Sequence, residues 1–118
     1  MNRLRVQLAR IEALRLTGQI SRAGIASNWL LALAEESGEP KLYANCLIEA
    51  ARLRMEEGQQ NLAEEYLERA RRIFSNIGSP EGCARVLTLL GQALIQHGEY
   101  QNASANLQRA RAHPPQSR

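Results

Sequence analysis

Residues 58–71 read GQQNLAEEYLERAR, and residues 98–111 read GEYQNASANLQRAR. A looser third copy starts at Gly18, so three glycines follow one another at intervals of 40 residues, each with an alanine five positions later. Self-similarity at a fixed period of this length is the sequence signature of repeat proteins, in which each unit packs only on its neighbours. The sequence therefore predicts a solenoid, whose product is an extended surface rather than a reaction site.

The composition of the chain favours helices over strands. Only 4% of its 118 residues are aromatic, while alanine, leucine, arginine, glutamate and glutamine dominate, and all of these are good helix formers. A chain of this length fits a single domain that can bury a core. We therefore expect an all-α protein.

Each unit should contain two helices joined by a turn at its glycine. In the second unit, Gly58 supplies the left-handed backbone conformation that ends a helix, and the Gly-Ser-Pro-Glu stretch at residues 78–81 separates the second unit from the third. The same reading of all three units predicts six antiparallel helices. The expected domain covers residues 1–112, with repeats at about 2–38, 41–78 and 81–112, and residues 113–118 form a short flexible tail.

The third unit carries a recognisable set of apolar and small residues: Leu87, Leu90, Gly91, Leu94, Gly98, Tyr100, Ala103, Leu107, Ala110 and Pro115. In type and spacing this set resembles the tetratricopeptide repeat family. The period of 40 residues exceeds the usual 34 of that family, and is similar to the long-helix subset found in kinesin light chains, LGN-type polarity adaptors and MalT-like bacterial regulators. The resemblance implies an α-solenoid of three helix-turn-helix repeats in a right-handed superhelix that binds proteins.

In this family, the first helix of each repeat lines a concave groove that holds an extended peptide. The groove positions that the resemblance implies here are Arg5, Asn45, Ile48, Arg52, Arg85, Thr88 and Gln92. Arg5, Asn45 and Arg85 share one register and would form a polar ladder. Because arginines bind carboxylates through forked hydrogen bonds and an amide both donates and accepts, we expect an acidic or C-terminal peptide as ligand. The alternative is a set of solvated side chains on an empty groove.

The second helix of the first unit breaks the pattern of the other two. In the later units, the outer side of the second helix has mostly charged residues. In the first unit the same positions hold Ile25, Trp29 and Ala32, so residues 23–34 are apolar nearly all round. A helix of this kind has both faces covered. We predict a homodimer or partner contact at Ile25, Trp29 and Leu33. The alternative is that the helix rotates and packs Trp29 on the preceding helix.

Both outer ends of the array are polar compared with the equivalent internal positions. Arg3, Gln7 and Arg10 at the start match Tyr43, Leu47 and Ala50 of the second unit. Because terminal repeats of soluble arrays carry polar outer faces, we expect a self-contained unit of three repeats. A piece cut from a longer array, such as a regulatory fragment of a signalling or transcription-regulator protein, is the alternative.

Other classes of function find little support in the sequence. The net charge is +3, but the basic residues form no stripe, so we expect no nucleic-acid partner. Two histidines and two cysteines show no catalytic or metal-binding spacing, and we expect no enzyme activity, no metal and no cofactor. No apolar run has the length of a signal peptide or membrane span, which favours a cytoplasmic protein that does not bind membranes. The leading hypothesis is an adaptor that binds a peptide, and the runner-up is a self-associating scaffold.

Overall fold

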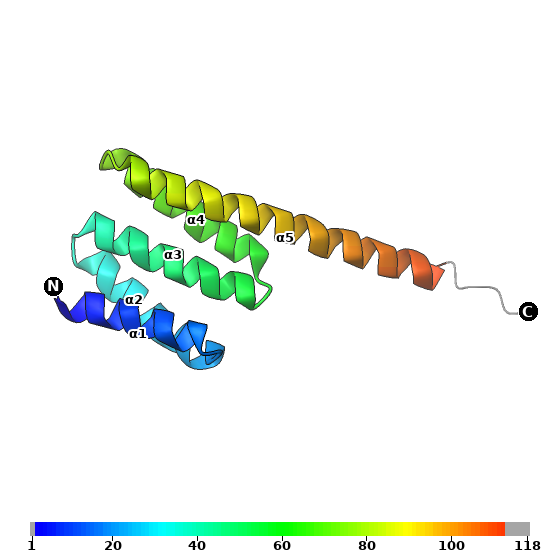
Figure 1. Ribbon diagram of the computed structural model, residues 1–118, viewed down its shortest axis with the longest axis horizontal. Coiled ribbons are helices and arrows are strands. Elements are labelled where there is room, and N and C mark those ends of the chain that lie inside the picture. The colour runs from blue at the N-terminus through cyan, green and yellow to red at the C-terminus, as the bar shows by residue number, and fades with distance from the viewer. Residues whose placement is uncertain (1, 113–118) are drawn as a thin grey trace, which may run out of the picture.

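A computed structural model describes residues 2–112, with side chains described for residues 3–109. This part of the chain contains five helices and no strand (Figure 1). They are α1 (Asn2–Leu16), α2 (Ile20–Glu36), α3 (Pro40–Glu56), α4 (Gln60–Asn76) and α5 (Pro80–Ala112). The all-α prediction is confirmed. The predicted tail at 113–118 lies outside the described residues.

Four turns, each with a glycine, connect the five helices in order. Gly18, Gly38, Gly58 and Gly78 have φ angles of 80°, 75°, 78° and 70°, in the left-handed region that side chains resist. After Gly58, the backbone N–H of Gln59 donates to the carbonyl oxygen of Arg54 at 2.8 Å. This bond closes the helix end as in a Schellman motif. The sequence placed all four of these turns correctly.

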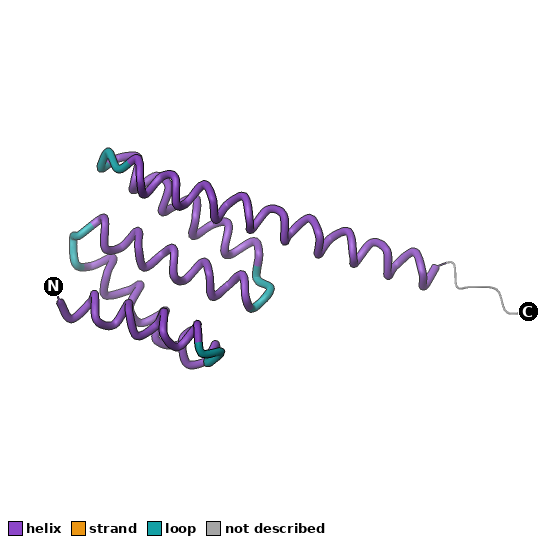
Figure 2. Tube along the Cα trace, in the orientation of Figure 1, coloured by secondary structure: helices purple, strands orange, loops and turns teal. Residues whose placement is uncertain are grey.

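The prediction of six helices is wrong, because the expected turn at Gly98 is absent. Residues 80–112 form one helix of 33 residues that runs straight through Gly98 and projects beyond the other helices (Figures 1 and 2). A glycine inside a helix costs only about 1 kcal/mol relative to alanine. The expected sixth helix would also bury less than α4 does, since histidine and proline at 113 and 114 replace Ile73 and Phe74.

Helix α3 lies at the centre of the core. One cluster of buried side chains joins it to α4 and the first half of α5, and includes Leu47, Leu67, Phe74 and Val86. A second cluster joins α3 to α1 and α2 through residues such as Ile11 and Leu30. Both clusters contain several alanines, so the helices pack closely around α3.

Candidate functional site

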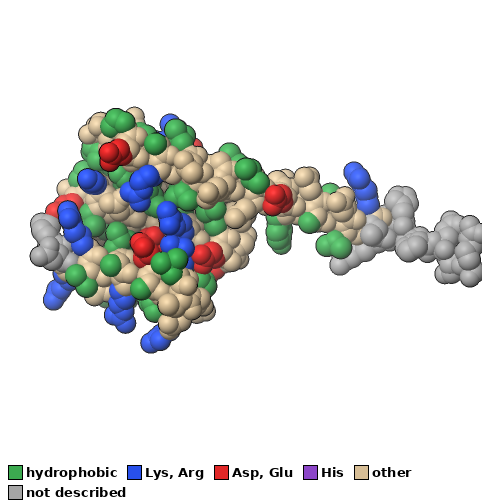
Figure 3. Space-filling view, in the orientation of Figure 1, with side chains coloured by type: hydrophobic (Ala, Val, Ile, Leu, Met, Phe, Trp, Pro, Cys, Tyr) green, Lys and Arg blue, Asp and Glu red, His purple; other side chains and the backbone are tan. Residues whose placement is uncertain are grey.

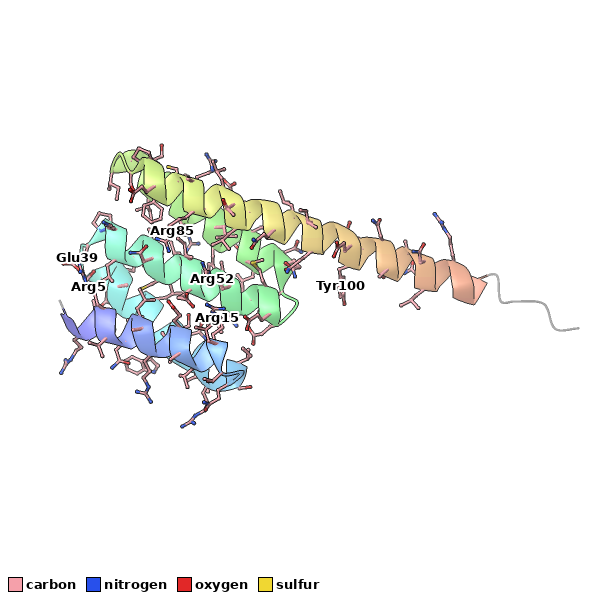
Figure 4. All side chains as sticks on the ribbon, in the orientation of Figure 1. Arg5, Arg15, Glu39, Arg52, Arg85 and Tyr100 are labelled. Carbon is pink, nitrogen blue, oxygen red and sulfur yellow. The ribbon has the colours of Figure 1, made fainter. Side chains whose placement is uncertain are left out.

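The helices α1, α3 and α5 lie side by side on one face of the molecule (Figure 4). Two hollows lie on this face. The first has a volume of about 520 Å³ and is lined by Arg15, Arg52, Met55, Glu56, Arg85, Thr88, Leu89, Gln92 and Gln96. The second has a volume of about 500 Å³ and is lined by Arg5, Leu8, Gly38, Glu39, Pro40, Lys41, Leu42 and Asn45. We call this face the groove.

Six of the seven predicted groove residues line these hollows. Arg52, Arg85, Thr88 and Gln92 line the first, and Arg5 and Asn45 line the second. The two hollows are linked where Nη1 of Arg85 donates a hydrogen bond to Oδ1 of Asn45 at 3.2 Å. The polar ladder expected along α1, α3 and α5 is therefore formed in part, between its second and third members.

Ile48 is the exception among the predicted groove residues. Its side chain is only 1% exposed and belongs to the core cluster shared by α3, α4 and α5. The assignment of Ile48 to the groove needs correction, because a buried side chain offers no surface to a ligand. On a helix that packs on both sides, burial of a large aliphatic side chain in the core stabilises the fold more than its placement on an open face would.

An ion-pair network that the sequence analysis did not predict crosses the groove floor. Nε of Arg15 donates to Oε2 of Glu49 at 3.0 Å, and its Nη1 donates to Oε1 of Glu56 at 3.3 Å. Burial lowers the pKa of Arg15, but the hydrogen bonds and charges of Glu49 and Glu56 outweigh burial and raise it overall. Arg15 is therefore a fixed cation whose charge is already compensated.

Glu49 is a buried carboxylate, and its position in the sequence is the signal that could have revealed this pair. Its counterpart 40 residues later is Leu89, which is 8% exposed and belongs to the core. A carboxylate at a core position needs a cationic partner. Arg15 on the neighbouring helix α1 is that partner.

Neither Arg52 nor Arg85 forms an ion pair with an acidic side chain among the described residues. Nε of Arg52 is buried and has no hydrogen-bond partner within the described residues. Arg85 donates to the neutral amide of Asn45. A buried donor without a partner costs about 1–3 kcal/mol, so the first hollow combines two uncompensated cations with one unsatisfied donor.

The outer side of α2 carries exposed apolar side chains, as the sequence predicted. Ile25 is 68% exposed, Trp29 70% and Leu33 44%. The alternative in which Trp29 packs inward on α1 is wrong. A hollow of about 470 Å³ lies beside it, lined by Arg3, Leu4, Gln7, Ala26, Trp29, Leu30 and Leu33. We call Ile25, Trp29 and Leu33 the α2 patch.

Two further titratable side chains, Cys46 and His97, lie at contacts between helices. Burial, with a smaller contribution from the charge of Glu49, raises the pKa of Cys46 to about 11, so its thiol is inert near neutral pH. Nδ1 of His97 lies 2.8 Å from Oε2 of Glu64 and ties α5 to α4. No group of three histidine, cysteine or carboxylate side chains that could hold a metal ion occurs within residues 3–109.

Among the helices of residues 2–112, none combines the length and apolar character needed to span a membrane.

Comparison with known proteins supports the assignment of the repeat. A family model described as tetratricopeptide repeat matches residues 44–115, which is more than half of the chain. No curated protein and no solved structure matched the sequence. The match includes most of the second repeat and all of α5, whose first half supplies Arg85, Thr88 and Gln92 to the groove. The chain therefore belongs to the tetratricopeptide repeat family.

Proposed function

We propose that the chain is a non-enzymatic adaptor that holds an extended peptide in the groove of α1, α3 and α5. Repeats of this family generally mediate contacts between proteins. The ligand we propose carries acidic side chains or a free C-terminal carboxylate. The observation that supports this choice is the pair of uncompensated guanidinium groups, Arg52 and Arg85, which line one hollow. In this proposal the protein works in the cytoplasm and binds neither nucleic acid nor membrane.

The two carboxylates that contact Arg15 at the first hollow have a cationic partner already. Glu49 and Glu56 both accept hydrogen bonds from Arg15, so they repel an incoming carboxylate less than free carboxylates would. Arg85 can exchange its hydrogen bond to the amide of Asn45 for one to a carboxylate of the ligand, because a charge-assisted hydrogen bond is stronger than one to an amide. Thr88 and Gln92 lie one turn and two turns further along α5, where they can bond the peptide backbone.

The test is selection from a library of short random peptides with free C-termini. The wild type should enrich acidic or C-terminal motifs. The variant Arg52→Gln/Arg85→Gln should lose at least about tenfold in affinity for them, because charge-assisted hydrogen bonds contribute about 1.5–3 kcal/mol each. A matched control is Arg22→Gln/Arg109→Gln, which removes two exposed arginines outside both hollows. Equal affinity in the groove variant and the control would refute the proposal.

We propose self-association through the α2 patch as a second candidate function. The observation that favours it is the exposure of Trp29 and Ile25 next to an open hollow, since exposed aromatic residues beside pockets are frequent centres of protein contacts. Trp29→Glu should convert a dimer to a monomer in sedimentation equilibrium, and Asn28→Glu is the control at the neighbouring exposed position. A monomeric wild type at high concentration would exclude this function.

A further inference from the structure

Helix α5 exposes an apolar stripe on its first half that is buried in the preceding repeat. The stripe consists of Ala84, Leu87, Gly91 and Leu94. Leu87 and Leu94 are each 56% exposed. Leu47, which is the counterpart of Leu87 forty residues earlier, has no exposed surface because α4 folds back and covers it. We call these four residues the proximal stripe.

The second half of α5 exposes the matching set. Leu107 is 61% exposed, and Ala103 is exposed too. Their counterparts on α4, Leu67 and Ala63, have no exposed surface. We call Ala103 and Leu107 the distal stripe. Apolar side chains are visible on this projecting part of α5 in Figure 3.

The two stripes point in different directions on the straight helix. With 3.6 residues per turn, Leu87 and Leu107 are separated by about 160° around the helix axis and by about 30 Å along it. A single partner helix running alongside α5 therefore cannot cover both stripes. A turn at Gly98 would bring the two stripes together, because it would reproduce the hairpin of α3 and α4, in which Leu47 and Leu67 share one core cluster.

Gly98 has the residue type that such a turn requires. Gly18 and Gly58, at the equivalent positions, both take the left-handed conformation, which glycine adopts at little cost. A side-chain methyl group added at Gly98 would meet nothing within 4 Å, so no close packing in the straight helix demands a glycine there. The residue is needed for the turn and only tolerated in the straight helix.

We propose that Gly98 is a hinge at which α5 exchanges between the straight helix and a closed hairpin. In the closed form, residues 101–109 fold back over the proximal stripe as α4 folds over α3. Closure covers both stripes, and opening exposes both of them to solvent. The groove residues Arg85 and Thr88 stay in place, because the first half of α5 remains anchored on α4 in both forms.

Distance measurement between spin labels on Glu81→Cys and Arg109→Cys tests the hinge. Both positions are exposed. Cys83 is replaced by serine, and the buried Cys46 is left in place. The straight helix separates the two backbones by about 42 Å at 1.5 Å per residue, whereas a hairpin brings them within about 20 Å. Labelled protein is diluted with unlabelled protein so that contacts between copies do not contribute.

The proposal predicts two distance populations in the wild type. Gly98→Ala should shift them at least about tenfold toward the long distance, since alanine favours the helix and resists the left-handed turn. Leu107→Glu should do the same, because it places a charge in the closed interface. Gln108→Glu, at the next position, should leave the wild-type ratio unchanged. A single long distance that Leu107→Glu does not alter, or a single short one that Gly98→Ala does not alter, would overturn the hinge.

Discussion

The second and third repeats carry the same turn glycine at the same position but have different backbones. At Gly58 the chain reverses with φ of +78°, and α4 packs back on α3. At Gly98 the helix continues, and α5 extends into solvent. The comparison shows that a glycine permits a turn but does not impose one. The apolar surface that the second helix of the pair can bury decides between the two outcomes.

The buried surface differs clearly between the two pairs. Helix α4 buries Ala63, Leu67, Ala70 and Phe74. The ring of Phe74 also packs directly on Gly82 at the start of α5, where any side chain would collide with it. The third repeat has proline at the position equivalent to Phe74. A closed third hairpin would therefore bury less apolar surface than the second one does, which is a condition of the proposed exchange at Gly98.

The largest expected effect on stability is the difference between alanine substitutions at two equivalent leucines, Leu67 and Leu107. Leu67→Ala removes a fully buried side chain and should lower the free energy of unfolding by about 2–5 kcal/mol. Leu107→Ala should lower it by less than about 1 kcal/mol, because this side chain is 61% exposed. Urea denaturation followed by circular dichroism measures both. Equal losses would mean that the third repeat is as firmly closed as the second.

The next effect concerns Cys46, which lies in the second repeat and is covered by residues of α1 and α2. Burial raises the pKa of its thiol from 9.0 to about 11. The stabilising contribution is complete below pH 9, and it falls as the pH rises toward 11, because only the unfolded chain ionises readily in that range. The loss should reach about 2–3 kcal/mol at pH 11.

The control for the Cys46 prediction is its replacement by alanine. Cys46→Ala is less stable at pH 8, but its stability should fall less steeply than that of the wild type between pH 9 and 11. Chemical denaturation over this pH range measures both slopes, and identical slopes in Cys46→Ala and wild type would show that α1 and α2 do not cover the thiol.

The third prediction is that replacement of the turn glycine by alanine has different effects on stability in the second and third repeats. Gly58→Ala forces a side chain into the left-handed region and should destabilise the protein by about 1–2 kcal/mol. Gly98→Ala should leave the stability unchanged or raise it by up to about 1 kcal/mol, since Gly98 is helical in α5. Urea midpoints of the two variants decide the matter. Destabilisation by both substitutions would indicate that the turn at Gly98 dominates.

The contrast between Gly58 and Gly98 also explains how far the sequence predicted the structure. The repeat period located four turns and the helices between them, because each of these turns has a glycine in the left-handed conformation. The period could not distinguish a turn that forms from one that does not, since both carry glycine. Six of the seven groove positions that the family resemblance implies line the two hollows, whereas Ile48 does not, because the register of a helix does not tell which side of a doubly packed helix is covered. The pairing of Arg15 with Glu49 depends on contacts across 34 residues, which no local pattern encodes.

The smallest effect concerns the point at which α5 leaves α4. Nδ1 of His97 lies 2.8 Å from Oε2 of Glu64, and Nε2 of Gln101 lies 2.9 Å from Nε2 of His97. Both contacts are satisfied if His97 donates through Nδ1 and accepts from Gln101. About a quarter of each of the His97 and Glu64 side chains is exposed, so a double-mutant cycle of His97→Ala and Glu64→Ala should give a coupling energy of about 0.5–1 kcal/mol. Because the bond to Gln101 requires an unbroken helix beyond Gly98, Gln101→Ala should weaken this coupling if the straight form is populated. A coupling that does not respond to Gln101→Ala would show that the chain already turns away at Gly98 in most molecules.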